Sequence, residues 1–231
     1  MKQIKPDLWQ TSLYKTGMLS SHAYYLKTPK GGVLLYNTGD RADLDEIDSL
    51  GGIDYQLLTH RDESAPSQKT IRERFHSKLV CSEYELSAII KNGAVDIALE
   101  KGDHTIYDIK IIETPGHTGG SISFYYESKH GNYLFTGDTI FQWKGKWSTL
   151  VISSAGGNTK ALQKSLTRLK AFDPDIVMSS GFVEDSALVH IRKNDWCKVI
   201  NLSLIQISEP TRPYSISDAV FCLKKNKPNN T

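Results

Sequence analysis

The chain has 231 residues, of which 39% are hydrophobic, a length and composition typical of a globular protein with a sizeable core. Its 28 basic and 26 acidic residues leave a formal net charge of only +2, which argues against a nucleic-acid partner. No apolar run approaches the roughly 20 residues that cross a bilayer, no signal peptide is evident, and three scattered cysteines fit a reduced, cytoplasmic protein with no membrane partner.

The first 60 residues are predicted to form mostly β-structure that leads to a histidine. Aromatic, β-favouring segments are typical of strands at 8–14, 22–28 and 33–37. A short polar helix over 43–50 follows, and then an apolar run that stops just before His60. An amphipathic segment begins soon after, so the order is strand, loop and helix. Open α/β sheets present functional side chains in this order, at the carboxyl ends of their strands.

The rest of the chain continues to alternate between strands and helices. We expect strands at 78–81, 107–113, 121–126, 133–136 and 175–178, and helices at 68–75, 83–91, 161–172 and 184–203. The strand at 107–113 leads into the loop that holds His117. The strands at 121–126 and 133–136 have the pattern of a hairpin that ends at Asp138.

His60, His117 and Asp138 each follow an apolar run and are the strongest candidates for a functional site. Two imidazoles and one carboxylate suit Zn²⁺ or Fe²⁺ and leave positions open for water or substrate. Taken singly, each residue also fits an ordinary loop or cap, and the neighbouring Gly116 and Gly137 fit simple turns. We expect the three loops to meet and to hold one divalent metal ion, zinc or iron.

Two of these loops resemble signature motifs of the metallo-β-lactamase superfamily. They are residues 114–122 (TPGHTGGSI) and 134–139 (LFTGDT). Residues 57–60 (LLTH) resemble the start of a third motif, and residues 34–39 resemble the strand and turn before it. The resemblance runs in the family's order from about residue 8 to residue 183. It implies an α/β (α+β) fold, the four-layer αββα sandwich, over a domain of residues 1–204, and a metal-dependent hydrolase.

The chain departs from the family pattern at the remaining metal-ligand positions. Where the family has a second histidine and then an Asp-His pair, this chain has Asp62, Ser64 and Ala65, and the family's late histidine falls near Ser180. Serine and alanine cannot replace those residues as strong ligands. The resemblance therefore implies at most one metal ion, with Asp62 as a possible further ligand. It also makes a dinuclear hydrolase of the glyoxalase II type unexpected.

Three functional interpretations remain open at this point, because a fold alone does not decide an activity. The first is a single-metal hydrolase of a small ester, thioester or lactone, in which Asp62 or Glu63 orients or deprotonates the water. The second is a mononuclear-iron sulfur dioxygenase, since His60, His117 and Asp138 match the positions that the persulfide dioxygenase branch uses for iron. The third is a catalytically inactive binding or scaffold protein with no metal.

Aromatic residues close to the expected site are candidates for a substrate pocket. Trp143 and Trp147 flank a glycine turn shortly after Asp138, and Tyr14 is a candidate for the opposite wall. The alternative for the two tryptophans is a hydrophobic cap over the helix layer. Either enzymatic interpretation implies a small-molecule substrate, whereas the oligomeric state cannot be inferred from the sequence.

Residues 205–231 are set apart from the domain. Segments 205–214 and 219–225 resemble a peptide that arises when sequencing-adapter reads are translated. The alternative is an ordinary mobile C-terminus. We expect a non-native or disordered tail without function.

Overall fold

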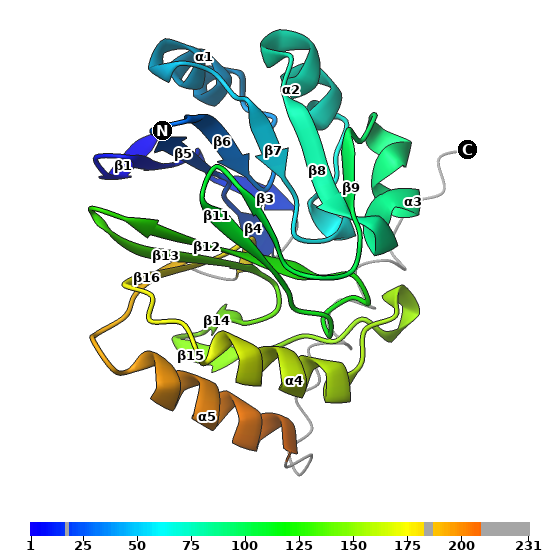
Figure 1. Ribbon diagram of the computed structural model, residues 1–231, viewed down its shortest axis with the longest axis vertical. Coiled ribbons are helices and arrows are strands. Elements are labelled where there is room, and N and C mark those ends of the chain that lie inside the picture. The colour runs from blue at the N-terminus through cyan, green and yellow to red at the C-terminus, as the bar shows by residue number, and fades with distance from the viewer. Residues whose placement is uncertain (17–18, 183–186, 209–231) are drawn as a thin grey trace.

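The computed structural model describes residues 1–16, 19–182 and 187–208, and its centre is formed by two β-sheets that face each other (Figure 1). Helices lie along the outer face of each sheet. Those beside the first sheet are α1 (Arg41–Leu50), α2 (Ser67–Phe75) and α3 (Leu86–Ile89), and those beside the second sheet are α4 (Thr159–Leu169) and α5 (Trp196–Ser208). This arrangement confirms the four-layer αββα sandwich.

The first sheet is mixed. Its spatial order is β1 (Lys2–Lys5), β2 (Leu8–Gln10), β5 (Tyr24–Thr28), β6 (Gly31–Leu35), β7 (Tyr55–Leu57), β8 (Lys78–Ser82) and β9 (Ile97–Leu99). The pairings from β1 to β6 are antiparallel, and those from β6 to β9 are parallel. The carboxyl ends of β6, β7 and β8 therefore share one edge, and the loop with His60 leaves β7 at that edge.

The second sheet is antiparallel except at one pairing. Its order is β10 (His104–Ile106), β11 (Ile109–Glu113), β12 (Ile122–Ser128), β13 (Gly131–Gly137), β16 (Ile176–Ser179) and β18 (Leu188–His190). Strands β13 and β16 run parallel, with Tyr133 opposite Ile176. Because parallel strands end at the same edge, Asp138 after β13 comes close to Ser180 after β16.

Short elements complete the described chain. Two small sheets pair β14 (Phe141–Trp143) with β15 (Lys146–Ser148), and β4 (Leu19–Ser21) with both β3 (Tyr14–Thr16) and β17 (Gly181–Phe182). The 3₁₀ turns are η1 (Arg61–Glu63), η2 (Glu83–Glu85), η3 (Ile90–Asn92) and η4 (Ser153–Ala155). Two of these turns, η1 and η2, follow the carboxyl ends of β7 and β8, where they shape the edge that carries His60.

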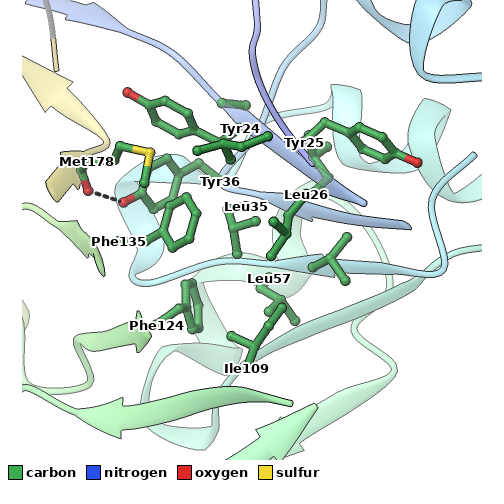
Figure 2. Close-up of a cluster of buried hydrophobic side chains, with 14 of the residues drawn as sticks. Tyr24, Tyr25, Leu26, Leu35, Tyr36, Leu57, Ile109, Phe124, Phe135 and Met178 are labelled. Atoms are coloured by element: carbon green, nitrogen blue, oxygen red, sulfur yellow. Dashed lines mark hydrogen bonds between the residues drawn. The ribbon is translucent and has the colours of Figure 1, made fainter. Parts of the chain in front are cut away.

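The core between the two sheets is rich in aromatic side chains (Figure 2). Tyr24, Tyr36 and Phe135 are fully or almost fully buried and meet edge to face, with ring centroids 5.8–6.3 Å apart. The Tyr36 hydroxyl donates to the Met178 carbonyl at 2.7 Å and accepts from the Gly137 N–H at 3.0 Å. One buried hydroxyl of the first sheet therefore holds two strands of the second sheet, just before Asp138.

The C-terminal part differs from the prediction. The helix expected over 184–203 begins only at Trp196, because residues 188–190 form β18 and extend the sheet beside β16. Helix α5 then runs to Ser208, four residues past the expected domain boundary at 204. Leu204 and Ile207 pack against the apolar cluster between α4 and the second sheet, which includes Leu162, Leu166 and Trp196. This packing explains why the helix continues to Ser208. The remainder of the expected tail, residues 209–231, lies outside the described residues.

A membrane crossing was not expected from the sequence. Within residues 1–16, 19–182 and 187–208, none of the helices combines the length and the apolar character that such a crossing requires.

Candidate metal centre

His60, His117 and Asp138 come together, as the sequence predicts. One potential ligand atom from each lies within 4.8 Å of the others. The Asp138 Oδ2 is 3.5 Å from the His60 Nε2 and 3.9 Å from the His117 Nε2, and the imidazole rings stand perpendicular with centroids 4.6 Å apart. Donor atoms with bonds of about 2 Å to one tetrahedral ion stand about 3.3 Å apart, so the widest pair would have to approach by up to about 1.5 Å. The group therefore has the size of a coordination sphere.

The two histidines present free nitrogens to a common point. The Nε2 atoms of His60 and His117 are buried without a hydrogen-bond partner, a state found for no other buried side-chain nitrogen or oxygen in the described part of the chain. A buried polar atom left unpaired costs about 1–3 kcal/mol, so such atoms are rare in folded proteins. Two of them side by side, facing a carboxylate, fit the donor set of a cation.

The opposite nitrogen of His117 is already engaged. Its Nδ1 lies 3.0 Å from the Leu150 carbonyl, which can only accept a hydrogen bond, so Nδ1 carries the proton. In the neutral ring, the Nε2 lone pair is then left for the centre. The backbone that follows Leu150 also packs on this loop, because the Ile152 N–H donates to the His117 carbonyl at 2.8 Å. Residues 150–152 thus determine how the ring points.

His60 is held in a similar way by Thr59 and Glu63. Its Nδ1 lies 2.9 Å from the Thr59 hydroxyl and 3.3 Å from the Glu63 carboxylate. The Thr59 hydroxyl in turn donates to Glu63, and the Thr59 N–H donates to the same carboxylate at 2.7 Å. A carboxylate behind a histidine ring is the arrangement that commonly orients metal-binding histidines and raises their basicity.

This position bears on the role expected of Glu63. Its side chain is only 4% exposed, and its carboxylate lies at Nδ1, across the ring from the free Nε2 of His60. The carboxylate is therefore engaged behind the ring and supports His60. The expected role of Glu63 as the base stays a prediction.

Asp138 offers one oxygen to the centre while the other is held in place. Its Oδ1 accepts hydrogen bonds from the Ser180 hydroxyl at 2.8 Å and from the Gly181 N–H at 2.9 Å. This leaves Oδ2 facing the two histidines. Ser180, which stands near the late histidine of the resembled family, thus orients a metal-binding candidate.

Gly137 lets the Asp138 strand approach the His60 loop. Its φ of 55° lies in the left-handed region, and a Cβ built there would lie 2.1 Å from the Thr59 hydroxyl oxygen. Only glycine both adopts this positive φ without strain and, having no Cβ, leaves Thr59 in place.

The charges of the site favour a cation. Burial alone would lower the pKa of His60, but the nearby carboxylates of Asp138 and Glu63 raise it well above its usual value. Burial, followed by the charge of His60, lowers the pKa of His117. For Asp138, burial alone would raise the pKa, yet the neighbouring His60 and His117 hold it well below its usual range. The pocket therefore stabilises one positive charge on His60, beside Asp138 Oδ2, and disfavours a second one on His117.

The residues at the other metal-ligand positions of the resembled family do not join this group. Asp62 is exposed and is not among the residues whose ligand atoms converge. Ser64 turns away, because its hydroxyl donates to the Gln68 side chain at 2.9 Å. A role for Asp62 as a ligand or base therefore stays a prediction.

The expected aromatic pocket is only partly supported. Trp147 packs its ring on Trp196 of α5 with centroids 5.8 Å apart, as the hydrophobic-cap alternative predicts. Trp196 belongs to the apolar cluster that also contains Leu162 and Leu166. Tyr14 is 66% exposed, and Trp143 is half-buried in β14. A groove of about 540 Å³ beside Gly119 and Gly120 is lined by none of these aromatic residues. The substrate pocket thus stays a prediction.

Sequence reasoning missed the residues that orient the candidate ligands. Thr59, Leu150 and Ser180 act through a backbone carbonyl or a hydroxyl. Serine and threonine occur throughout the chain, and every residue has a backbone carbonyl, so residue type does not indicate which of these groups will orient a ligand. Adjacency to a ligand was the one available signal, and it applies only to Thr59.

Comparisons with known proteins identify relatives of this chain. The family model described as the metallo-beta-lactamase superfamily matches residues 47–181. Hydroxyacylglutathione hydrolases of Brucella ovis and Brucella abortus are 30% identical over 93 residues, which is 38% of this chain and 34% of each relative. The match thus spans about a third of the length of these curated relatives.

Solved structures resemble most of this chain. A metallo-beta-lactamase from Pontibacter korlensis has a TM-score of 0.67 at 17% identity, covering 90% of this chain and 98% of its own. A protein solved in a di-iron-bound form has a TM-score of 0.59 at 22% identity, covering 78% and 94%. At such low identities, these similarities show the fold alone.

Proposed function

This chain belongs to the metallo-β-lactamase superfamily, and from that premise we propose that it is a hydrolase of a small ester, thioester or lactone that works with one divalent metal ion. The ion is held by the Nε2 atoms of His60 and His117 and by Oδ2 of Asp138. One observation carries the proposal. The two imidazole nitrogens are buried without hydrogen-bond partners, beside a carboxylate oxygen that faces them.

The residues present fit such an ion. Two nitrogens and one carboxylate oxygen are typical zinc ligands, and three protein ligands are the number usual in catalytic sites that keep a position open. When bound, the ion would supply Lewis acidity, lowering the pKa of water and polarising a carbonyl. The chain's part is to keep the three donor atoms aimed at one point, through Glu63 behind His60, Leu150 behind His117 and Ser180 behind Asp138.

Asp62 is the candidate for moving a proton. It lies on η1, two residues after His60, and its side chain is exposed. Since the carboxylate of Glu63 is committed to Thr59 and His60, Asp62 is the acid of this turn that remains free to orient water or substrate.

The substrate class rests on the curated relatives. Their name, hydroxyacylglutathione hydrolase, describes cleavage of a thioester. The match covers only 34% of each relative, so their complete substrate-binding surface has no established counterpart here. A thioester is therefore the first substrate to test, followed by simple esters and lactones.

Iron chemistry is the second candidate. Two histidines and one carboxylate also form the facial ligand set of non-haem Fe(II) oxygenases. One structural neighbour was solved in a di-iron-bound form, which supports iron as an ion that this fold accepts. A mononuclear-iron sulfur dioxygenase would use the same three donor atoms and would differ in metal and co-substrate.

An inactive binding protein is supported less well. Two adjacent, unpaired imidazole nitrogens destabilise a protein that binds no metal, because each buried polar atom without a hydrogen-bond partner costs free energy. Hydrogen-bonding partners at those positions would make such a protein more stable. That interpretation instead predicts that chelators leave the protein's stability unchanged.

The test is to purify the protein without a metal-chelating column and reconstitute it separately with zinc and with Fe(II). Thioester hydrolysis by the zinc form supports the proposed function, whereas thiol-dependent oxygen uptake by the iron form supports the second candidate. If neither form is active and neither metal raises the melting temperature, both enzymatic proposals are overturned and the binding protein remains.

A further inference from the structure

A buried acid next to the candidate metal centre has no role in the chemistry above. Glu85 ends η2, just after β8, and its side chain is fully buried. Moving a carboxylate out of water costs several kcal/mol unless its oxygens are paired. The hydrogen-bond partners of Glu85 therefore have to offset the cost of burying its carboxylate.

One oxygen of Glu85 pairs with the His60 loop. The Glu85 Oε2 accepts a hydrogen bond from the Nε of Arg61 at 2.5 Å. Arg61 directly follows His60 and is 25% exposed, so the pair lies at the margin of the interior, where charge pairing is weakly screened. The backbone that carries the His60 ring is thus fastened to η2.

The other oxygen pairs with the His117 loop. The Glu85 Oε1 accepts from the Thr118 hydroxyl at 2.9 Å and from the Gly120 N–H at 3.0 Å. Thr118 directly follows His117 and is fully buried. A single carboxylate therefore binds the residues next to both histidines.

Close packing reinforces this contact. A Cβ on Gly120 would lie 2.7 Å from the Glu85 Oε1, and a Cβ on Gly119 would lie 2.4 Å from the Tyr84 ring. The Ser82 hydroxyl also donates to the Gly120 carbonyl at 2.6 Å. The corner at residues 82–85 can meet the His117 loop this closely only because two glycines are present.

The two loops belong to different sheets. The His60 loop leaves β7 of the first sheet, whereas the His117 loop connects β11 and β12 of the second. A small displacement between the sheets would therefore change the distance between the two Nε2 atoms. Once an ion is bound, its donor atoms have to be held within about 0.5 Å of the productive geometry.

We propose that Glu85 is a positioning residue of the metal centre, whose carboxylate ties the His60 and His117 loops together and thereby sets the separation of their Nε2 atoms. This inference rests on the proposed function, since it assumes that these atoms bind a metal. Glu85 is not among the three residues whose donor atoms converge, and both of its oxygens pair with the neighbouring loops.

The test is the zinc affinity of Glu85→Gln, measured by competition with a chromophoric chelator. The variant keeps the volume of the side chain but removes the charge that pairs with Arg61. We expect affinity to fall about tenfold or more, the range seen when groups behind metal ligands are lost. In the cobalt-substituted protein, the visible absorption bands should shift, because the ligand geometry relaxes.

Asp96→Asn is the matched control. Asp96 also accepts from an arginine, Arg72, and from a backbone N–H, that of Leu79 at 2.9 Å. It lies near the start of β8, whereas Glu85 follows the end of that strand. The control should lose stability while keeping the zinc affinity and the cobalt spectrum of the wild type.

Thr118→Val serves if Glu85→Gln does not fold, because it removes only one of the three hydrogen bonds to Glu85. Its zinc affinity should also fall, by a smaller factor. Wild-type affinity in every folded Glu85 or Thr118 variant would overturn the positioning role and leave the proposed function standing. If the wild type itself takes up no zinc or cobalt, the proposed function fails, and the positioning role fails with it.

Discussion

Replacing Tyr36 with phenylalanine isolates one buried hydroxyl that links the two sheets (Figure 2). The ring stays, so the edge-to-face packing with Tyr24 and Phe135 is kept and no cavity larger than an oxygen atom forms. The Met178 carbonyl keeps only a secondary contact with the Thr136 hydroxyl at 3.3 Å, because the one hydrogen of that hydroxyl points mainly to the Ile140 carbonyl at 2.8 Å. The Gly137 N–H loses its partner inside the core.

The expected effect follows from that single orphaned donor. An unsatisfied buried N–H costs about 1–3 kcal/mol, so Tyr36→Phe should lower the free energy of unfolding by that amount. For a chain of this size, the melting temperature should fall by about 2–12 °C. Urea unfolding in the presence of chelator measures this difference without a contribution from metal, and the m-value should stay unchanged.

Tyr24→Phe is the control for this prediction. Tyr24 lies in the same cluster and is equally buried, but its hydroxyl only accepts a 3.3 Å hydrogen bond from Gln10. Its loss takes the acceptor from the buried Gln10 amide, but that bond is long and the Gln10 side chain can rotate, unlike the fixed Gly137 N–H, so the cost should stay at about 0.5–1 kcal/mol. If Tyr36→Phe is no more destabilising than Tyr24→Phe, the hydroxyl does not hold the strand before Asp138, and the account of how the second sheet is aligned fails.

Three further predictions concern the site. Gly137→Ala forces a Cβ against Thr59 at a left-handed backbone position, so calorimetry should show a free energy of unfolding that is lower by at least about 1 kcal/mol. A variant as stable as the wild type would contradict the close approach of Gly137 to Thr59. Glu63→Gln weakens the support behind His60, and its zinc affinity by chelator competition should fall about 10–100-fold; wild-type affinity would show that Glu63 has no such role. Restoring the family's ligands should raise bound zinc, determined by elemental analysis, from about one to about two per chain, whereas a value that stays at one would mean that more than missing ligands prevents a second ion. The required replacements are Asp62→His, Ser64→Asp, Ala65→His and Ser180→His.

The sandwich could be predicted from the resemblance to a known family, and the three converging residues could be predicted because the motifs that carry them are local. Apolar runs mark strands, and the motifs around His117 and Asp138 occupy contiguous stretches. The orientation of neighbouring side chains was not predictable in this way. Asp62 and Glu63 are adjacent acids, yet only Glu63 turns inward to Thr59, because η1 places successive side chains on different sides.

Errors occurred where tertiary contacts outweigh local preference. Residues 188–190 lie in a segment expected to be helical, but they form β18 because β16 offers an open edge for pairing. For Trp147 the sequence left a pocket wall and a hydrophobic cap both open, and the ring packs against Trp196 on α5. Sequence distance from a ligand says little about which way a side chain points after a hairpin.

The central claim is that His60, His117 and Asp138 bind one metal ion. The most direct measurement is the metal content of the untagged protein after reconstitution and gel filtration, determined by elemental analysis for the wild type and for His117→Ala. We predict about one equivalent of zinc or iron in the wild type and none in the variant. A wild type without metal, or a variant that retains the same amount, would contradict it.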